Sequence, residues 1–286
     1  MSAPVATGAE LAPGYRTIEL LRRGRDLDVY DVWSEERACR CVIKAVRPDR
    51  IDHDGARRRL LDEGRLLCRL THPHIVRAYE VIEEPVPMVV METLAGETLG
   101  HMIDREAELS GPELAQLGLH LCSAIVYLHR NGVLHLDLKP SNVIAECGRA
   151  KLIDLSVARP PGPAHAGIGT HYYLSPEQAR GGQLGPPADV WGIGVVLFEA
   201  ATGEPAFDDP DAPDGDEDDD YGDSFSETLD EGDYPQLAAP ATRIDELRPL
   251  PAELVDSVAA CLDPEPARRP GVDELMRALE PLGDGA

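Results

Sequence analysis

The chain has 286 residues, of which 43% are hydrophobic, and it carries a formal net charge of −25. This length and composition predict a folded globular protein with one large domain or two lobes, while the negative charge argues against nucleic acid or an anionic membrane as a partner and favours basic partners. The N-terminal stretch lacks the basic and apolar regions of a signal peptide and no apolar run could cross a bilayer, so a cytoplasmic location is expected.

The first part of the chain has the pattern of a sheet that carries one helix. Residues 1–14 show no regular pattern and are expected to be flexible. Residues 15–46 alternate apolar and polar positions in three clusters, which predicts three antiparallel strands. The apolar residues of 55–70 recur at helical spacing and a proline follows, so a helix is expected there. Two more strands are predicted within 74–94.

From residue 95 to 283 the pattern is mainly helical. Ser110 and Glu113 have the spacing of a capping box in front of a long helix. Helices are predicted at 114–130, 188–202, 251–262 and 272–282, and short strands at 142–146 and 150–154. The stretch 208–223, in the acidic block 208–233, has no core-forming residues, so a mobile insertion is expected.

Lysine and cysteine usage adds two constraints. Only three of the 27 basic residues are lysines: Lys44, Lys139 and Lys151. Lysine is a compact point charge and arginine a planar fork, so a lysine in such an arginine-rich chain is expected where an ammonium group is required. The six cysteines have neither metal-site spacing nor the density of a disulfide scaffold, so we expect reduced structural thiols at positions 39, 41, 68, 122, 147 and 261.

Seven short motifs follow one another along the chain. They are CVIK ending at Lys44, Glu63 nine residues before HP, HLDLKPSN at 135–142, DLS at 154–156, GTHYYLSPE ending at Glu177, ADVWG at 188–192 and RRP at 268–270. In this order they resemble the protein kinase superfamily, specifically the bacterial Hanks-type Ser/Thr protein kinases, over about residues 15–283. The resemblance implies an α+β bilobal fold, with a small antiparallel-sheet N-lobe with one helix (15–94) and a larger, mainly helical C-lobe (95–283).

The resemblance also implies a role for each matching residue. The catalytic residues would be Asp137 as the base, Lys139 as the clamp on the γ-phosphate, and Thr170 beside the base. The metal ligands would be Asn142 and Asp154. The ATP-binding residues would be Gly24, Val29, Val42, Lys44, Glu63, Glu92, Leu94 and Ile144, with Glu63 forming an ion pair with Lys44. The structural anchors would be His135, Glu177, Asp189 and Arg269, with Glu177 paired to Arg269 and Asp189 holding the backbone of the loop that carries Asp137. ATP is the implied cosubstrate, with Mg²⁺ or, in its place, Mn²⁺.

Several positions depart from the family pattern. The Gly-rich loop keeps only Gly24, with Arg22 and Leu27 in two glycine positions, so the phosphates would be held less closely. The arginines around it either supply charge to the phosphates or are solvated. Val42 replaces a small alanine under the adenine, and Ser156 replaces the glycine of DFG. The acidic block occupies the place where the family has the start of helix G.

Leu136 is the departure with a regulatory consequence. The family commonly has an arginine here that pairs with a phosphorylated residue of the activation loop. Leucine cannot form that pair, and residues 157–169 contain no Ser, Thr or Tyr to be phosphorylated. A kinase of the non-RD type, active without activation-loop phosphorylation, is therefore predicted.

The function predicted from the resemblance is ATP-dependent phosphorylation of Ser or Thr in a protein substrate, with no nucleic acid partner and no membrane segment; the negative charge favours a basic substrate. One alternative is a pseudokinase that acts as a nucleotide-sensing binding or scaffold module, which the eroded Gly-rich loop favours. A second is a small-molecule phosphotransferase of the aminoglycoside-kinase type. The motifs GTHYYLSPE, ADVWG and RRP argue against the second, because they build a docking floor for a peptide.

Overall fold

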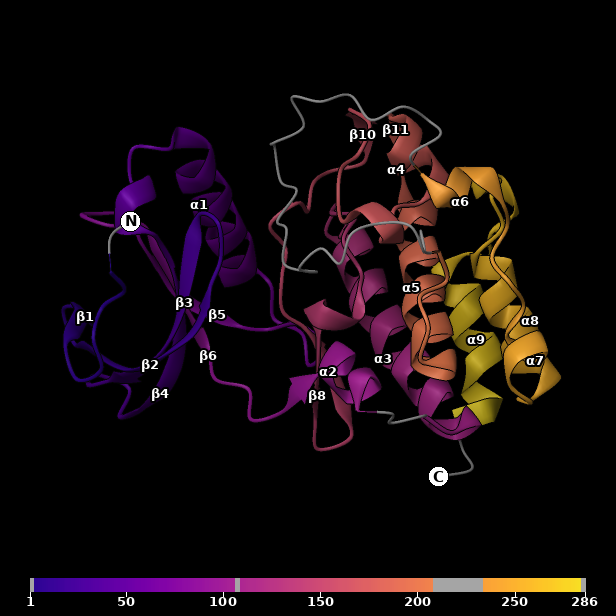
Figure 1. Cartoon of the computed structure of the whole chain (residues 1–286), viewed down its shortest axis with the longest axis horizontal. Coiled ribbons are helices and arrows are strands. Elements are labelled where there is room, and N and C mark those ends of the chain that lie inside the picture. The colour runs from indigo at the N-terminus through magenta and orange to yellow at the C-terminus, as the bar shows by residue number, and fades with distance from the viewer. Residues whose placement is uncertain (1–2, 106–108, 208–233, 284–286) are drawn as a thin grey trace. The chain divides into compact units, whose positions relative to one another are not determined.

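The computed structural model describes residues 3–105, 109–207 and 234–283 (Figure 1). These residues divide into two compact units, with the division between Ala95 and Gly96. The acidic block at 208–233, which the sequence predicts to be a mobile insertion, lies outside the described residues. Within the described ranges, no helix combines the length and the apolar character that a membrane crossing requires.

The first unit is built on a six-stranded antiparallel sheet with the order β1-β2-β3-β4-β6-β5. Its elements are β1 (Glu10–Ala12), β2 (Tyr15–Arg23), β3 (Leu27–Ser34), β4 (Cys39–Val46), a 3₁₀ turn (Pro48–Arg50), α1 (Asp54–Arg69), β5 (Ala78–Ile82) and β6 (Met88–Glu92). The five predicted strands and the predicted helix are present. Strand β1 differs from the prediction of a flexible stretch at 1–14: it pairs with β2, because Gly14 at a φ of 79° permits the tight turn between them.

Side chains alternate along β4 and separate two faces of the sheet. Cys41, Ile43 and Ala45 are buried in the apolar core of this unit. Val42 and Lys44 lie on the opposite face and are half-buried. The sheet therefore presents Lys44 on the face that does not contribute to this core.

Helix α1 packs against β5 and β6 and positions Glu63. It begins after His53, whose Nδ1 accepts a hydrogen bond from Ala56 N at 3.1 Å. Gly64 permits close approach to the sheet, since a Cβ at this position would lie 2.5 Å from Val89 Cγ2. A larger residue would push α1 away from β6, so Gly64 sets the distance at which Glu63 reaches the sheet.

The second unit is mainly helical and contains a three-stranded and a two-stranded sheet, β7-β8-β9 and β10-β11. Its earlier elements are β7 (Glu97–Thr98), α2 (Leu99–Asp104), α3 (Gly111–Arg130), a 3₁₀ turn (Pro140–Asn142), β8 (Val143–Glu146), β9 (Arg149–Leu152) and β10 (Gly162–Ala164). Its later elements are a 3₁₀ turn (His171–Tyr173), α4 (Pro176–Arg180), β11 (Gly182–Leu184), α5 (Pro186–Thr202), α6 (Pro235–Ala238), α7 (Ile244–Leu247), α8 (Ala252–Cys261), a 3₁₀ turn (Pro266–Arg268) and α9 (Val272–Gly283).

Helix α5 is the centre of the second unit and is buried along nearly its whole length. It lies beside α3 and α8, and α9 packs on α3 (Figure 1). Gly192 of α5 permits a close contact with the loop 135–142, because a Cβ there would lie 2.8 Å from Leu138 Cβ. The loop that carries HLDLKPSN is therefore seated directly on this buried helix.

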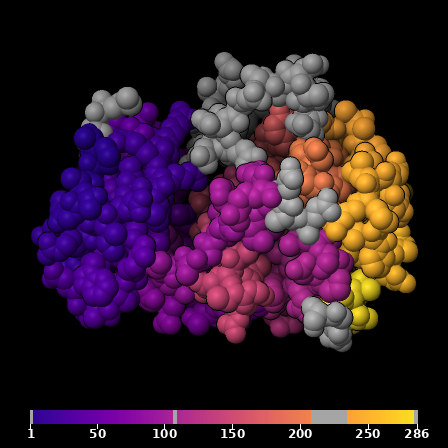
Figure 2. Space-filling view, turned by 60° about the horizontal axis from the view of Figure 1, so that its bottom comes forward, coloured from indigo at the N-terminus to yellow at the C-terminus, as the bar shows by residue number. Residues whose placement is uncertain are grey.

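The longer predicted elements of the second unit are all present, as α3, α5, α8, α9, β8 and β9. The predicted capping box also forms, with Ser110 N donating to Glu113 Oε2 at 2.8 Å. The elements that the sequence did not predict are short, and so they give no measurable periodicity: β7, α2, β10, α4, β11, α6 and α7. Figure 2 shows the chain from residue 234 onward, in orange and yellow, gathered on one flank of this unit.

All six cysteines are free thiols, as the sequence predicts. Burial raises the pKa of Cys41 to about 11 and that of Cys122 to about 12. Both thiols therefore stay protonated near neutral pH, where the thiolate would be the reactive form.

Candidate active site

The first unit contains the ion pair that the sequence predicts between β4 and α1. Lys44 Nζ lies 2.7 Å from Glu63 Oε1. The side chains are 12% and 1% exposed, respectively, so the pair is shielded from water. Lys44 stands opposite Val29 on β3 and Val89 on β6, which fixes its position in the sheet. The ammonium group is thus held at one place by a carboxylate that moves only with α1.

The turn around Gly24 is fixed by arginines that the sequence reasoning did not identify. Gly24 O accepts a hydrogen bond from Arg47 Nη1 at 2.8 Å. Asp26, at the tip of the turn, forms an ion pair with Arg59 of α1 at 3.2 Å. Arg59 precedes Glu63 by one helical turn, so α1 holds both the turn and the lysine. This hydrogen bond and this ion pair join residues far apart in the chain, and no motif spacing signals them.

The other residues predicted to bind ATP occupy different parts of the chain. Val29 and Val42 are half-buried, on β3 and β4. Glu92 ends β6, and its Oε1 accepts a hydrogen bond from Arg77 N at 3.0 Å. Leu94 lies just before the division between the units. Ile144 belongs to the second unit, on β8.

In the second unit, the loop 135–142 and the segment around Thr170 form a polar cluster. Thr170 Oγ1 donates to Asp137 Oδ1 at 2.7 Å and accepts from Lys139 Nζ at 2.8 Å. Asn142 Nδ2 donates to Asp137 Oδ2 at 2.9 Å. The structure thus brings together the three predicted catalytic residues and one predicted metal ligand. The carboxylate keeps lone pairs that can accept a proton from a substrate.

The two predicted metal ligands are connected through the backbone. Ile153 N donates to Asn142 O at 3.1 Å, and Asp154 follows directly. Asn142 Nδ2 donates to the backbone oxygen and to Oδ2 of Asp137. The amide oxygen of Asn142 therefore points away from Asp137. Asp154 Oδ1 accepts from Ser156 N at 2.8 Å, which orients the carboxylate.

These ligands fit Mg²⁺ shared with a nucleotide. No group of three or more His, Cys, Asp or Glu side chains among the described residues could hold a metal ion alone. Mg²⁺ prefers oxygen ligands and is usually bound by one or two protein groups together with substrate phosphates. A carboxylate and an amide oxygen match that donor set, and they suit Mn²⁺ as well.

Asp189 of α5 holds the backbone of the loop 135–142, as predicted. Its Oδ1 accepts from Leu136 N at 2.8 Å and its Oδ2 from His135 N at 2.9 Å. His129 Nε2 lies 2.7 Å from the same Oδ2, a partner that the sequence reasoning missed. His135 Nδ1 accepts from Asp137 N at 3.2 Å, and burial lowers the pKa of His135, so its ring is neutral.

Leu136 has an unusual backbone and an apolar environment. Its φ is 66°, a left-handed conformation that is uncommon for residues other than glycine. Its side chain is 4% exposed and packs in a cluster with Leu134, Leu184 and Ala188. Ile168 of the segment before Thr170 is packed against the same cluster. Apolar packing therefore occupies the position where the family commonly has a charged group.

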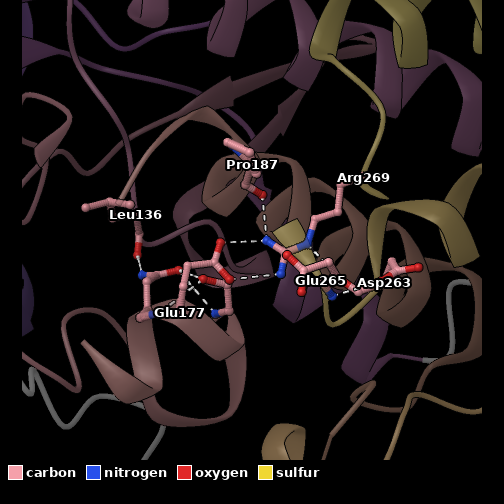
Figure 3. A network of polar contacts seen from close by, with 8 residues as sticks. Leu136, Glu177, Pro187, Asp263, Glu265 and Arg269 are labelled. Carbon is pink, nitrogen blue, oxygen red and sulfur yellow. Dashed lines mark hydrogen bonds and ion pairs between the residues drawn. The ribbon is translucent and has the colours of Figure 1, made fainter. Parts of the chain in front are cut away.

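The predicted anchor pair, Glu177 and Arg269, forms a bidentate ion pair (Figure 3). Arg269 Nη1 and Nη2 donate to the two carboxylate oxygens at 2.7 and 2.9 Å. Arg269 also donates to Pro187 O and Asp263 O, at 2.9 and 2.8 Å, and lies over the Trp191 ring. One buried side chain thus ties α4, α5 and the segment before α9.

Comparisons with known proteins agree with these observations. The family model described as protein kinase domain matches residues 15–279. The probable serine/threonine-protein kinase PknB of Lactococcus lactis is 33% identical over 214 residues, which is 71% of this chain and 34% of that protein. The serine/threonine-protein kinase PknB of Mycobacterium tuberculosis is 31% identical over 216 residues, with the same two shares, 71% and 34%. This chain spans about a third of the length of the curated relatives that it matches.

Proposed function

Because the chain belongs to the protein kinase domain family, we propose that it transfers the γ-phosphoryl group of ATP to Ser or Thr hydroxyls of a protein substrate. The observation that carries this proposal is the cluster in which Thr170 links Lys139 to the Asp137 carboxylate, at 2.8 and 2.7 Å. The relatives that are named serine/threonine-protein kinases support the same acceptor class. The anchored segment at Glu177 supports a peptide rather than a small molecule as the acceptor.

The proposed chemistry places each side chain at one atom of the reaction. Asp137 accepts the proton of the substrate hydroxyl while that oxygen attacks the γ-phosphorus, and the bond to the bridging oxygen breaks to release ADP. Lys139 stabilises the charge on the transferred group, and Lys44 binds the α- and β-phosphates. Mg²⁺, when bound, neutralises phosphate charge, and Asn142 and Asp154 would hold it.

Transfer of labelled γ-phosphate by the purified protein tests this function. The assay supplies ATP and Mg²⁺ with a generic basic protein, and it also measures labelling of the protein itself. We expect label on Ser or Thr, identified by phosphoamino-acid analysis. Absence of label on both proteins, with ATP binding retained, would favour the pseudokinase. The intact set of Lys44, Glu63, Asp137, Asn142 and Asp154 argues against that alternative.

We further propose that activity does not depend on phosphorylation of the activation segment. The support is the apolar cluster around Leu136, which orders this region by packing and contains no partner for a phosphate. The prolines in the run RPPGP restrict the loop and lower the entropy it loses on ordering.

Protein treated with phosphatase, and shown by mass spectrometry to carry no phosphate, is expected to keep its initial rate. Leu136→Arg is expected not to create a requirement for phosphorylation, because residues 157–169 have no hydroxyl group that could pair with the new guanidinium. Loss of activity on dephosphorylation, with the essential phosphate at Thr170 or within 157–169, would contradict the proposal.

We also propose that the acidic block favours basic substrates. The chain resumes after this block at Tyr234, which is buried and whose ring lies 4.9 Å from that of His171. Gln236 Nε2 then donates to His171 O at 2.8 Å. The acidic sequence is thus joined to the chain beside GTHYYLSPE, the segment proposed to dock the substrate, where its charge would attract basic peptides.

Deletion of residues 208–223 is expected to leave turnover of a neutral peptide unchanged and to raise the KM for a basic peptide by about tenfold at low salt. Steady-state kinetics at low and high ionic strength measure both effects. The difference between the two peptides should shrink as salt screens the charges. An equal KM change for both peptides, or loss of folding, would contradict an electrostatic role.

A further inference from the structure

We propose that Gln178 is a positioning residue that fixes the activation segment to the loop of the catalytic base, and this inference rests on the proposed kinase function. Gln178 lies in α4 and is 2% exposed. Its Nε2 donates to Leu136 O at 2.7 Å and to Ile168 O at 2.8 Å. One neutral amide therefore joins two segments that are 32 residues apart in the sequence.

The orientation of this amide is fixed on its other side as well. Gln178 Oε1 accepts from Ser175 N at 3.2 Å and from Ser175 Oγ at 2.9 Å. The backbone oxygen of Gln178 accepts from Gly167 N at 2.8 Å. A reversed amide would place its oxygen against two carbonyl oxygens, which repel it. The capping box of α4 thus directs the amide nitrogen toward Leu136 and Ile168.

The two carbonyl groups that Gln178 holds lie close in sequence to the two partners of the Asp137–Thr170 hydrogen bond. Leu136 O belongs to the peptide group that joins Leu136 to Asp137. The nitrogen of that peptide group donates to His135 Nδ1 at 3.2 Å, so Gln178 and His135 fix its two ends. Ile168 O lies two residues before Thr170. Gln178 therefore sets the positions of Asp137 and Thr170 through the backbone of the residues that precede them.

Gly169 shows how closely the two segments are packed. It has a φ of 113°, and a Cβ there would lie 2.7 Å from Leu136 O and 3.2 Å from Gln178 Nε2. Only glycine permits both this backbone conformation and this approach. In the family, an arginine and a phosphate commonly hold such a loop. Here a buried neutral amide does so at any phosphorylation state.

The test compares Gln178→Met and Gln178→Glu in single-turnover phosphoryl transfer between pH 8 and pH 6. At pH 8 both variants are expected to transfer about 10- to 100-fold more slowly than the wild type, because neither side chain donates to the carbonyl groups and the base is misplaced. Burial beside two carbonyl oxygens raises the pKa of a carboxyl group. Once protonated, the introduced carboxyl group donates one hydrogen bond, so the rate relative to wild type is expected to recover toward pH 6 in Gln178→Glu alone.

Gln183, exposed on β11, provides the matched control, and Gln183→Met and Gln183→Glu are expected to behave as wild type at every pH. An inactive wild-type protein would refute the kinase function itself. An active wild type with an unimpaired Gln178→Met, or with the same pH profile for both Gln178 variants, would overturn the positioning role. Thermal melts accompany each rate, and loss of folding in both Gln178 variants at pH 6 and pH 8 would also overturn it, since the residue would then be merely structural.

Discussion

Asp137→Asn and Lys44→Met are each expected to slow phosphoryl transfer by about 10²–10⁴-fold. Asparagine cannot accept the proton of the substrate hydroxyl. Its amide can still pair with Thr170 and Asn142, which now contact the two carboxylate oxygens at 2.7 and 2.9 Å, so the loop should keep its conformation. Methionine keeps an unbranched side chain, one atom shorter than that of lysine, but has no charge to place on the phosphates. Label transfer from γ-labelled ATP measures the rate, and thermal unfolding measures the fold.

Lys44→Met needs a control of its own, because it leaves the Glu63 carboxylate, which is 1% exposed, without its ammonium partner. A buried carboxylate that loses its partner destabilises the protein. The double variant Lys44→Met/Glu63→Gln is expected to recover stability but not activity. Arg149→Met removes an exposed basic residue of β9 and is expected to keep full activity. Equal labelling by the wild type and Asp137→Asn would rule out Asp137 as the base.

The sequence predicted the longer helices and strands of the fold. It also predicted the family. Alternation in 15–46 predicted β2, β3 and β4, and helical spacing predicted α1 and α3. The family match over residues 15–279 confirms the resemblance to protein kinases and the α+β fold class. Short elements such as β1 and α6 were missed, because three or four residues give no periodicity and tertiary contacts decide their conformation.

The ion pairs within the candidate site were predictable because the motifs name both partners. Lys44 with Glu63, and Glu177 with Arg269, are joined in the structure as expected. The contacts of Gln178 were not predictable. Ser175 and Gln178 have the spacing of a capping box, which indicates the start of α4. Nothing in that spacing shows that the same amide reaches Leu136, 42 residues earlier.

The Arg23–Asp28 pair and the Asp26–Arg59 pair illustrate the same limit in the eroded Gly-rich loop. The arginines around Gly24 were expected either to contact phosphates or to be solvated, yet Arg23 lies 3.6 Å from the buried carboxylate of Asp28. Part of the positive charge in this turn therefore forms ion pairs within the protein. A glycine-poor loop can be ordered by such ion pairs, which only the folded chain brings together.

Arg269→Met is expected to lower the free energy of unfolding by about 3–5 kcal/mol, the range for breaking one partner of a buried ion pair. The Arg269 side chain is fully buried and its partner Glu177 is 15% exposed. The substitution also leaves Pro187 O and Asp263 O without their donor. Urea unfolding followed by circular dichroism measures the change. The expected loss is large because one guanidinium serves four acceptor atoms, each of which keeps its desolvation cost when the donor is removed.

Two further variants separate the ion pair from the packing of Arg269. Arg269→Lys keeps the charge but cannot form the bidentate ion pair with Glu177. It should therefore keep only part of the stability that Arg269→Met loses. Arg269→Met/Glu177→Met removes both charges and should be more stable than Arg269→Met, because an uncompensated charge costs more than an absent pair. Arg243→Met breaks the exposed pairs with Asp245 and Asp256 and should leave stability unchanged. If Arg269→Met were no less stable than Arg243→Met, the pair could not be what holds α4 against α5, and the segment proposed to dock the substrate would have to be ordered by its other contacts, among them those of Gln178 and Gln236.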